Sequence, residues 1–130
     1  MDVTNPSITD YPPLLDANDP PLFEVINRRG NASVFLLCCH AGRSIPRELG
    51  DLGLNDEDRA RHISWDIGAA EVTREISQLL DAPAMLANYS RLVIDLNRLP
   101  GAYDSIPGFS DKTGIPGNGD LNDGDRTRRL

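Results

Sequence analysis

The sequence predicts an α/β fold, with a mixed, mostly parallel sheet flanked by helices. Three observations lead to this prediction: an unbroken apolar run at Ser33–Cys39, an amphipathic segment at Ile67–Leu80, and short strand-like segments between turns. An apolar run without polar alternation is typical of a strand covered on both faces. The chain has 130 residues, 39% hydrophobic and 25% charged, which is ordinary for one globular domain.

The charge balance argues against some classes of function. The 13 Lys and Arg residues stand against 20 Asp and Glu residues, so the net charge is −7, whereas nucleic-acid-binding proteins generally carry a basic surface. No apolar segment approaches the ~20 residues of a membrane span. Met1–Pro13 has neither the basic start nor the apolar stretch of a secretory signal. We therefore expect a cytoplasmic protein that binds neither nucleic acid nor membranes, and we leave assembly into a homo-oligomer open.

The N-terminal part is expected to lead into the domain without regular structure. Residues 1–21 are rich in proline and lack a repeating pattern, which indicates an extended lead-in before a domain at residues 22–130. Val25 and Ile26 are strand formers that precede a turn, and Ser33–Cys39 is the expected central strand. A short helix is expected at residues 55–63, because Asn55 can cap it and acidic residues fill its first turn.

A longer helix is expected from Ile67 to Leu80, with Asp66 as its candidate N-cap. Gly68, in the first turn, suggests that the backbone approaches another group closely there. The apolar residues follow the spacing of one helical face; they are Ala69, Val72, Ile76, Leu79 and Leu80.

Two further strands are expected, at Ala84–Ala87 and Arg91–Leu96, followed by irregular chain after Pro100. Asp123–Leu130 has the sequence of a helix start. No later strand or helix follows to cover the sheet, so we expect the domain to be truncated.

His40 is a candidate functional residue because it directly follows the apolar run. Ligands of α/β proteins bind beyond the carboxyl ends of strands, so a histidine in this place can serve as a metal ligand or a general base. The alternative is a histidine that only caps the strand and hydrogen-bonds the following loop.

The segment Arg91–Arg98 carries the other candidates. Alternation along a strand would place Arg91, Val93 and Asp95 on one face. Asn97 and Arg98 together offer an amide and a guanidinium fork, which suit a carboxylate; the alternative is a surface salt bridge. Asp95 lies in an otherwise apolar stretch and needs a partner, for which Arg91 or Arg98 is the natural choice.

Several of these segments resemble, in the same order, the N-formylglutamate amidohydrolase family over about residues 22–130. The family's members hydrolyse N-acyl amino acids, such as N-formyl-L-glutamate to formate and glutamate in histidine degradation. Their fold is similar to that of the zinc carboxypeptidases, in which a strand also ends in Asp-x-Asn-Arg. The matching segments are His40–Pro46, Leu49–Leu54, Arg61–Ala69, Tyr89–Arg98 and Ser105–Asn118.

The resemblance implies a role for each candidate residue. His40 is implied to be a zinc ligand, and Asp66 a second ligand or an orienting carboxylate. Asn97 and Arg98 are implied to bind the substrate carboxylate with help from Arg91, while Asp95 has a structural role. Zinc is the implied cofactor and a small N-acyl amino acid the implied substrate, which a zinc-bound water attacks.

Two features keep a second hypothesis open. Family members are considerably longer than this chain, and a later histidine expected to complete the metal site is absent. The alternative is therefore a truncated, non-catalytic protein that binds a small carboxylate without turnover. The enzyme hypothesis requires His40 and Arg98 to face one cleft.

Overall fold

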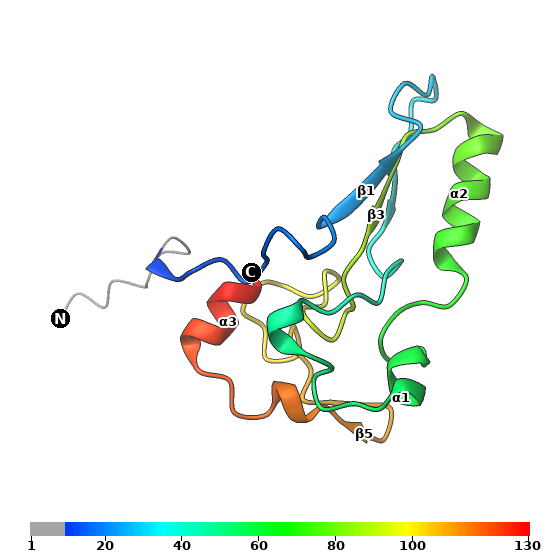
Figure 1. Cartoon of the computed structure of the whole chain (residues 1–130). Coiled ribbons are helices and arrows are strands. Elements are labelled where there is room, and N and C mark those ends of the chain that lie inside the picture. Colours follow the sequence, from blue (N-terminus) through cyan, green and yellow to red (C-terminus); the bar gives the residue numbers. More distant parts are fainter. Residues whose placement is uncertain (1–9) are drawn as a thin grey trace.

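The computed structural model describes residues 10–130 and contains a three-stranded mixed sheet (Figure 1). Its strands are β1 (Phe23–Ile26), β2 (Leu36–Cys38) and β3 (Ala84–Ala87), in the order β1-β3-β2. β1 runs antiparallel to β3, and β2 runs parallel to it. The expected α/β architecture with a mixed sheet and flanking helices is confirmed. The two kinds of pairing occur equally, so the sheet is not mostly parallel.

The lead-in predicted at residues 1–21 falls partly outside the described residues. Its described part, from residue 11 onward, contains no helix or strand. Side chains of the domain hold this part through its backbone carbonyls: the Tyr89 hydroxyl donates to the Pro20 carbonyl at 2.6 Å, and Arg128 Nε donates to the Pro12 carbonyl at 2.9 Å. The lead-in therefore lies against the domain in this region.

The predicted central strand is shorter than expected and lies at an edge. Of Ser33–Cys39, only Leu36–Cys38 is a strand, and it pairs with β3 alone among the described residues. Leu36 and Cys38 point to the side of the sheet that is packed, whereas Leu37 is 66% exposed on the other side. The prediction of a strand covered on both faces is wrong, because a continuous apolar run does not reveal how many neighbouring strands a sheet has.

Along the chain, two α-helices follow β2 and precede β3: α1 (Asp56–Ala60) and α2 (Ala69–Leu80). Asn55 caps α1 as expected, because its side chain accepts from the Asp58 amide at 2.8 Å. The predicted cap of the second helix is wrong, since Gly68 occupies the N-cap position and Asp66 does not. Gly68 has φ 85°, and nothing lies within 4 Å of a Cβ built there, so glycine is favoured by its backbone angle and not by a close approach.

α2 lies on one side of the sheet (Figure 1). Small side chains make its contact with the sheet. Ala69 and Ala70 pack against a buried cluster on the sheet, and Ser77 is the buried residue of the helix. Of the apolar face expected on this helix, Ala69 packs against the sheet, whereas Val72 and Leu79 are 57% and 81% exposed. The periodicity correctly predicted a helix, but most of its apolar face is exposed.

The predicted strand at Arg91–Leu96 is wrong, because this segment forms successive turns. Ser90 starts the first turn: its hydroxyl accepts from the Leu92 amide at 3.1 Å and its carbonyl accepts from the Val93 amide at 2.9 Å. A second turn forms where the Asp95 carboxylate accepts from the Asn97 amide at 2.9 Å. These local bonds take the place of sheet pairing. The predicted alternation of faces fails with the strand, since the consecutive residues Leu92 and Val93 are both buried.

The rest of the chain wraps a second core built mainly from loops. It includes the short strands β4 (Phe109–Ser110) and β5 (Thr113–Gly114), the 3₁₀ turns η2 (Arg47–Leu49) and η3 (Pro116–Asn118), and α3 (Asp123–Arg129), which confirms the predicted C-terminal helix. No helix in residues 10–130 has the length and apolar character needed to cross a membrane. The buried members of this core are Leu52, Leu54, Ile63, Leu92 and Ile115.

Candidate active site

The site forms where the parallel strands β2 and β3 end. Because the two strands are parallel, the loops that follow them leave the same edge of the sheet. They then run side by side: the Ser44 amide donates to the Asn88 carbonyl at 3.0 Å, and the Ser90 amide donates to the Ser44 carbonyl at 2.8 Å. A Cβ at Gly42 would come within 2.1 Å of the Asn88 carbonyl oxygen, so glycine permits this close approach. This pairing brings His40 next to the turns that follow Ser90.

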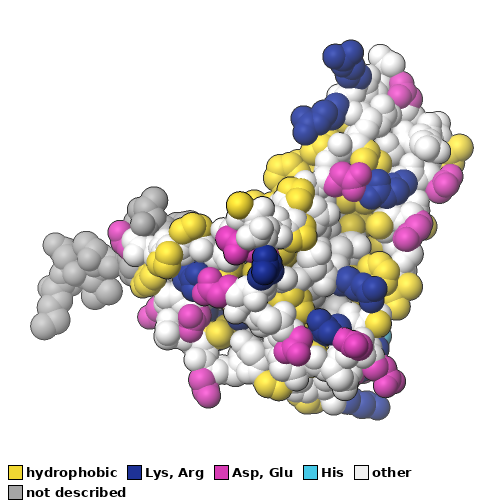
Figure 2. Space-filling model, in the orientation of Figure 1, with side chains coloured by type: hydrophobic (Ala, Val, Ile, Leu, Met, Phe, Trp, Pro, Cys, Tyr) yellow, Lys and Arg dark blue, Asp and Glu magenta, His cyan; other side chains and the backbone are white. Residues whose placement is uncertain are grey.

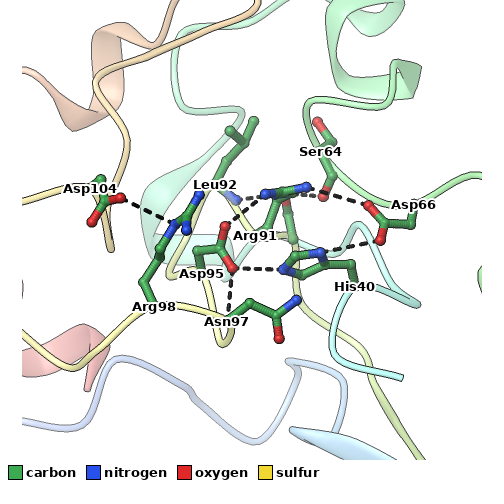
Figure 3. A network of polar contacts seen from close by, with 10 residues as sticks. His40, Ser64, Asp66, Arg91, Leu92, Asp95, Asn97, Arg98 and Asp104 are labelled. Atoms are coloured by element: carbon green, nitrogen blue, oxygen red, sulfur yellow. Dashed lines mark hydrogen bonds and ion pairs between the residues drawn. The ribbon is translucent and has the colours of Figure 1, made fainter. Parts of the chain in front are cut away.

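His40 lies between two carboxylates (Figure 3). Its Nε2 is 2.7 Å from Asp95 Oδ1, and its Nδ1 is 3.3 Å from Asp66 Oδ2. His40 and Asp95 are each only 5% exposed, whereas the Asp66 side chain is half-exposed. The Asp66 amide also donates to the His40 carbonyl at 2.9 Å, which ties the two segments together through the backbone.

Asp95 is ionised in this setting. Its burial would raise the pKa of the carboxyl group, but bonds from the Asn97 amide, His40 and Arg91 outweigh burial and lower that pKa below the usual value. An ionised carboxylate can only accept, so His40 Nε2 carries the hydrogen and donates it to Asp95. In the neutral imidazole the lone pair is then on Nδ1, which faces Asp66.

Arg91 connects the two carboxylates on the other side. Its Nη2 is 2.8 Å from Asp95 Oδ2, and its Nη1 is 3.4 Å from Asp66 Oδ1. Of the two expected partners of Asp95, Arg91 forms the ion pair with it, whereas the Arg98 side chain pairs with Asp104. With a neutral imidazole the group holds two carboxylates and one guanidinium, so it has an excess negative charge. A cation beside Nδ1, either a proton or a metal ion, would balance it.

Asn97 and Arg98 border the same network on its exposed side. The Asn97 side chain is exposed, and its backbone amide donates to Asp95. Arg98 forms an ion pair with Asp104, with Nε and Oδ2 3.2 Å apart and both side chains well exposed. Figure 3 shows the Arg98 guanidinium and the His40 ring on opposite flanks of Asp95. Arg98 joins this network through its backbone amide, which donates to the Asp95 carbonyl at 3.0 Å. The role of Asn97 and Arg98 in binding a substrate stays a prediction.

His40 and Asp66 fit two positions of a zinc site. Two ligands at zinc's usual bond lengths of ~2.0–2.2 Å and tetrahedral angle lie ~3.3–3.5 Å apart, and the observed separation of Nδ1 and Oδ2 is 3.3 Å. A histidine that binds zinc commonly donates its other N–H to a carboxylate, as His40 does to Asp95. However, no group of three or more His, Cys, Asp or Glu side chains suited to a metal occurs within residues 10–130. The separation is compatible with two zinc ligands, but the pair is one ligand short of a usual catalytic site.

Sequence reasoning missed the bond between His40 and Asp95. The two residues are 55 positions apart, and nothing in a single sequence indicates that the loops after β2 and β3 pair through their backbones. It also gave no partner for Arg43, whose guanidinium carbon lies 5.2 Å from the centre of the Trp65 ring. This cation–π contact fixes the residue before Asp66 against the loop after His40.

A model of the N-formylglutamate amidohydrolase family matches residues 32–130, which include every residue of this network. The chain belongs to the N-formylglutamate amidohydrolase family. The crystal structure of gene product Atu2144 from Agrobacterium tumefaciens is similar to it, with a TM-score of 0.85 and 34% identity over 89% of this chain. The match covers 46% of that protein, so this chain spans less than half its length. No curated protein matches this N-formylglutamate amidohydrolase-family chain significantly.

Proposed function

We propose that this chain carries part of the active site of an amidohydrolase that cleaves N-acyl amino acids, such as N-formyl-L-glutamate to formate and glutamate. Membership of the family supports the reaction class. The observation that carries the proposal is the placement of His40 between two carboxylates, with Nδ1 left as an acceptor beside Asp66. We also propose a zinc-carboxypeptidase-like architecture for the fold. Family membership and the Asp95–Arg98 sequence Asp-Leu-Asn-Arg support this assignment.

Zinc is the proposed cofactor, held by His40 Nδ1 and Asp66 Oδ2. Asp95 fixes the tautomer and orientation of the imidazole through its short bond to Nε2. Arg91 holds both carboxylates in place and offsets part of their charge. When bound, zinc would supply an activated water and polarise the acyl carbonyl.

Asn97 and Arg98 are the proposed binding site for the substrate carboxylate, with Arg91 in support. Arg98 bonds Asp104 through Nε alone in the described part of the chain, which leaves its terminal nitrogens for a bidentate carboxylate. An exposed ion pair of this kind is worth only ~0–1 kcal/mol, so a substrate can displace Asp104 at little cost. Cys38 and Cys39 are free thiols, which agrees with the cytoplasm as the proposed compartment.

Metal binding and turnover together test this proposal. The chain is expected to bind Zn²⁺ in competition with a chromogenic chelator, and His40→Ala should weaken that binding at least about tenfold, because it removes one of two donors. His62→Ala is the matched control, since His62 is 62% exposed and pairs with Asp111 away from the network. Zinc-dependent formate release from N-formyl-L-glutamate should disappear in the His40 variant alone. Equal zinc affinity in the two variants would contradict the ligand assignment.

The second candidate is a non-catalytic protein that binds a small carboxylate without turnover. The set of only two metal donors among the described residues favours it. It predicts that N-formyl-L-glutamate binds without zinc and is not hydrolysed, and that Arg98→Ala abolishes binding. If the protein is an enzyme, Arg98→Ala instead raises KM with little change in kcat, because uniform binding is lost. Neither binding nor turnover in the folded wild-type chain would reject both candidates.

A further inference from the structure

Two arginines from different segments of the chain, Arg43 and Arg59, line one cavity of about 440 Å³. Ser44 and Asp56 add polar side chains to its lining. We propose that this cavity binds a small oxyanion, the phosphate or carboxylate group of a ligand, between the two guanidinium groups. The cavity shares no lining residue with the carboxylate site proposed above.

Arg43 is held in place without a carboxylate. Its guanidinium carbon lies 5.2 Å from the centre of the Trp65 ring, over which the planar group is placed. Within residues 10–130 no acidic side chain forms an ion pair with Arg43. The guanidinium fork matches the geometry of carboxylate and phosphate, and stacking on an aromatic ring leaves its N–H groups for such partners. Arg43 therefore offers a positioned positive charge that the described residues do not neutralise.

Trp65 also explains how Arg59 comes to lie near Arg43. The indole N–H of Trp65 donates to the Ala60 carbonyl at 3.1 Å, at the end of α1. Arg59 directly precedes Ala60, so the ring under Arg43 also holds the helix that carries Arg59. The opposite wall is fixed as well, because the amide and carbonyl of Ser44 bond the loop after β3 at 3.0 and 2.8 Å. Both arginines thus extend from backbone that the fold holds in place.

Arg59 has a hydrogen-bond donor that the described residues leave unused. Its Nη2 pairs with Asp56, whose side chain is 96% exposed, while its Nε is buried and has no hydrogen-bond partner in residues 10–130. A buried donor without an acceptor is unfavourable, and an exposed ion pair is weak, so the guanidinium can turn toward a ligand at little cost. An oxyanion can accept from two N–H groups of one arginine at once.

The recognition of an anion must be local, since the chain as a whole repels anions. Its net charge is −7, and acidic and basic side chains are mixed over the face shown in Figure 2. The lining of the cavity instead holds two arginines and one aspartate, an excess of one positive charge. A local excess in a cavity raises the concentration of ions of the opposite sign there. It therefore favours an anion small enough to enter.

Two sources can supply the oxyanion. One is free phosphate or a phosphate ester. The other, which rests on the proposed function, is the second carboxylate of an acidic N-acyl amino acid such as N-formyl-L-glutamate. The lining is close in sequence to the candidate active site, because Arg43 follows His40 by three residues and Trp65 directly precedes Asp66. The cavity itself does not depend on that function.

The test titrates the full 130-residue chain with inorganic phosphate, with N-formyl-L-glutamate and with N-formyl-L-norvaline, which lacks the second carboxylate. Calorimetry gives the affinities, and the emission of Trp65, the one tryptophan of the chain, reports a ligand at Arg43. Phosphate, or N-formyl-L-glutamate in preference to N-formyl-L-norvaline, is expected to bind and to shift that emission. Arg43→Gln and Arg59→Gln should each weaken this binding at least about tenfold.

Two further variants are the controls. Arg28→Gln removes the same charge at an exposed arginine outside the cavity and should leave the affinity unchanged. Asp56→Asn removes the carboxylate that competes for Arg59 and should tighten binding. Circular dichroism checks that each variant is folded.

Three results would overturn the inference. They are no binding of phosphate or N-formyl-L-glutamate up to about 10 mM, an affinity in folded Arg43→Gln equal to that of the wild type, and binding that leaves the Trp65 emission unchanged. If N-formyl-L-glutamate is hydrolysed and Arg43→Gln keeps the preference over N-formyl-L-norvaline, the inference fails while the proposed function stands. Phosphate binding that depends on Arg43, without any turnover, would support the cavity and count against the proposed function.

Discussion

The two cores of this small domain differ in how completely they are buried, and their content of helix and strand does not explain the difference. The loop-built core around Leu92 contains almost no helix or strand, yet its members are nearly inaccessible. Within residues 10–130, the sheet, which has the regular structure, is packed only on the α2 side and leaves Leu37 and Phe23 exposed on the other. Closure of a core here depends on how many segments surround it, and not on the secondary structure of those segments.

The polar site and the exposed apolar surface lie in different regions of the domain. His40, Asp95 and Arg91 lie on the loop-built side, where hydrogen bonds satisfy the buried charges within the chain. Within residues 10–130, the sheet side instead has an open strand edge and an exposed apolar face. We therefore expect substitutions in the loop-built region to alter folding, and substitutions on the open face to alter association.

The largest expected effect comes from a pair of leucine substitutions that compares the two regions. Leu92 is 0% exposed in the loop-built core, so Leu92→Ala should lower the free energy of unfolding by about 4 kcal/mol through lost burial and a cavity. Leu37→Ala, at an exposed leucine of the sheet, should change it by less than about 0.5 kcal/mol. Urea unfolding measures both, and similar losses in the two variants would contradict the comparison.

A smaller effect is expected from the buried carboxylate. Asp95→Ala removes the partner of both His40 and Arg91, and leaving a buried charged group without its partner costs about 3 kcal/mol. Asp104→Ala removes an exposed pair with Arg98 and serves as the control, with a loss below about 1 kcal/mol. The same unfolding measurement applies. A loss in the Asp95 variant as small as in the control would show that the network does not stabilise the fold.

The smallest effect is a pH dependence caused by the same residue. The pKa of Asp95 lies below its ordinary value of 3.8 in the folded chain, so its ionisation stabilises the fold above that value. This contribution is lost as the pH falls through the folded pKa. The stability difference between wild type and Asp95→Asn should therefore shrink as the pH falls from about 5 to below 3.8. A difference that stays constant across this range, or grows toward acid, would contradict the assignment.

Prediction from the sequence succeeded where a local pattern decides the outcome. Asn55 with its acidic neighbours predicted the start of α1, and Ala84–Ala87 predicted β3. It failed at Arg91–Leu96, because the Ser90 hydroxyl and the Asp95 carboxylate bond neighbouring amides and turn the chain. For Asp95 it offered Arg91 or Arg98 as a partner, of which the structure has Arg91, and it did not find His40.

By itself, the sequence determined the residue types of the site, their order and the family to which they belong. The side-chain chemistry of a motif can be read from the sequence without the fold. His40, Asp66 and Arg98 could therefore be selected as site candidates from spacing and resemblance. The tertiary structure alone decided that β2 lies at an edge, that α2 turns its apolar flank outward and that His40 meets Asp95. These outcomes depend on contacts between distant segments, whose free energy is shared by the whole fold and is not encoded in any one stretch.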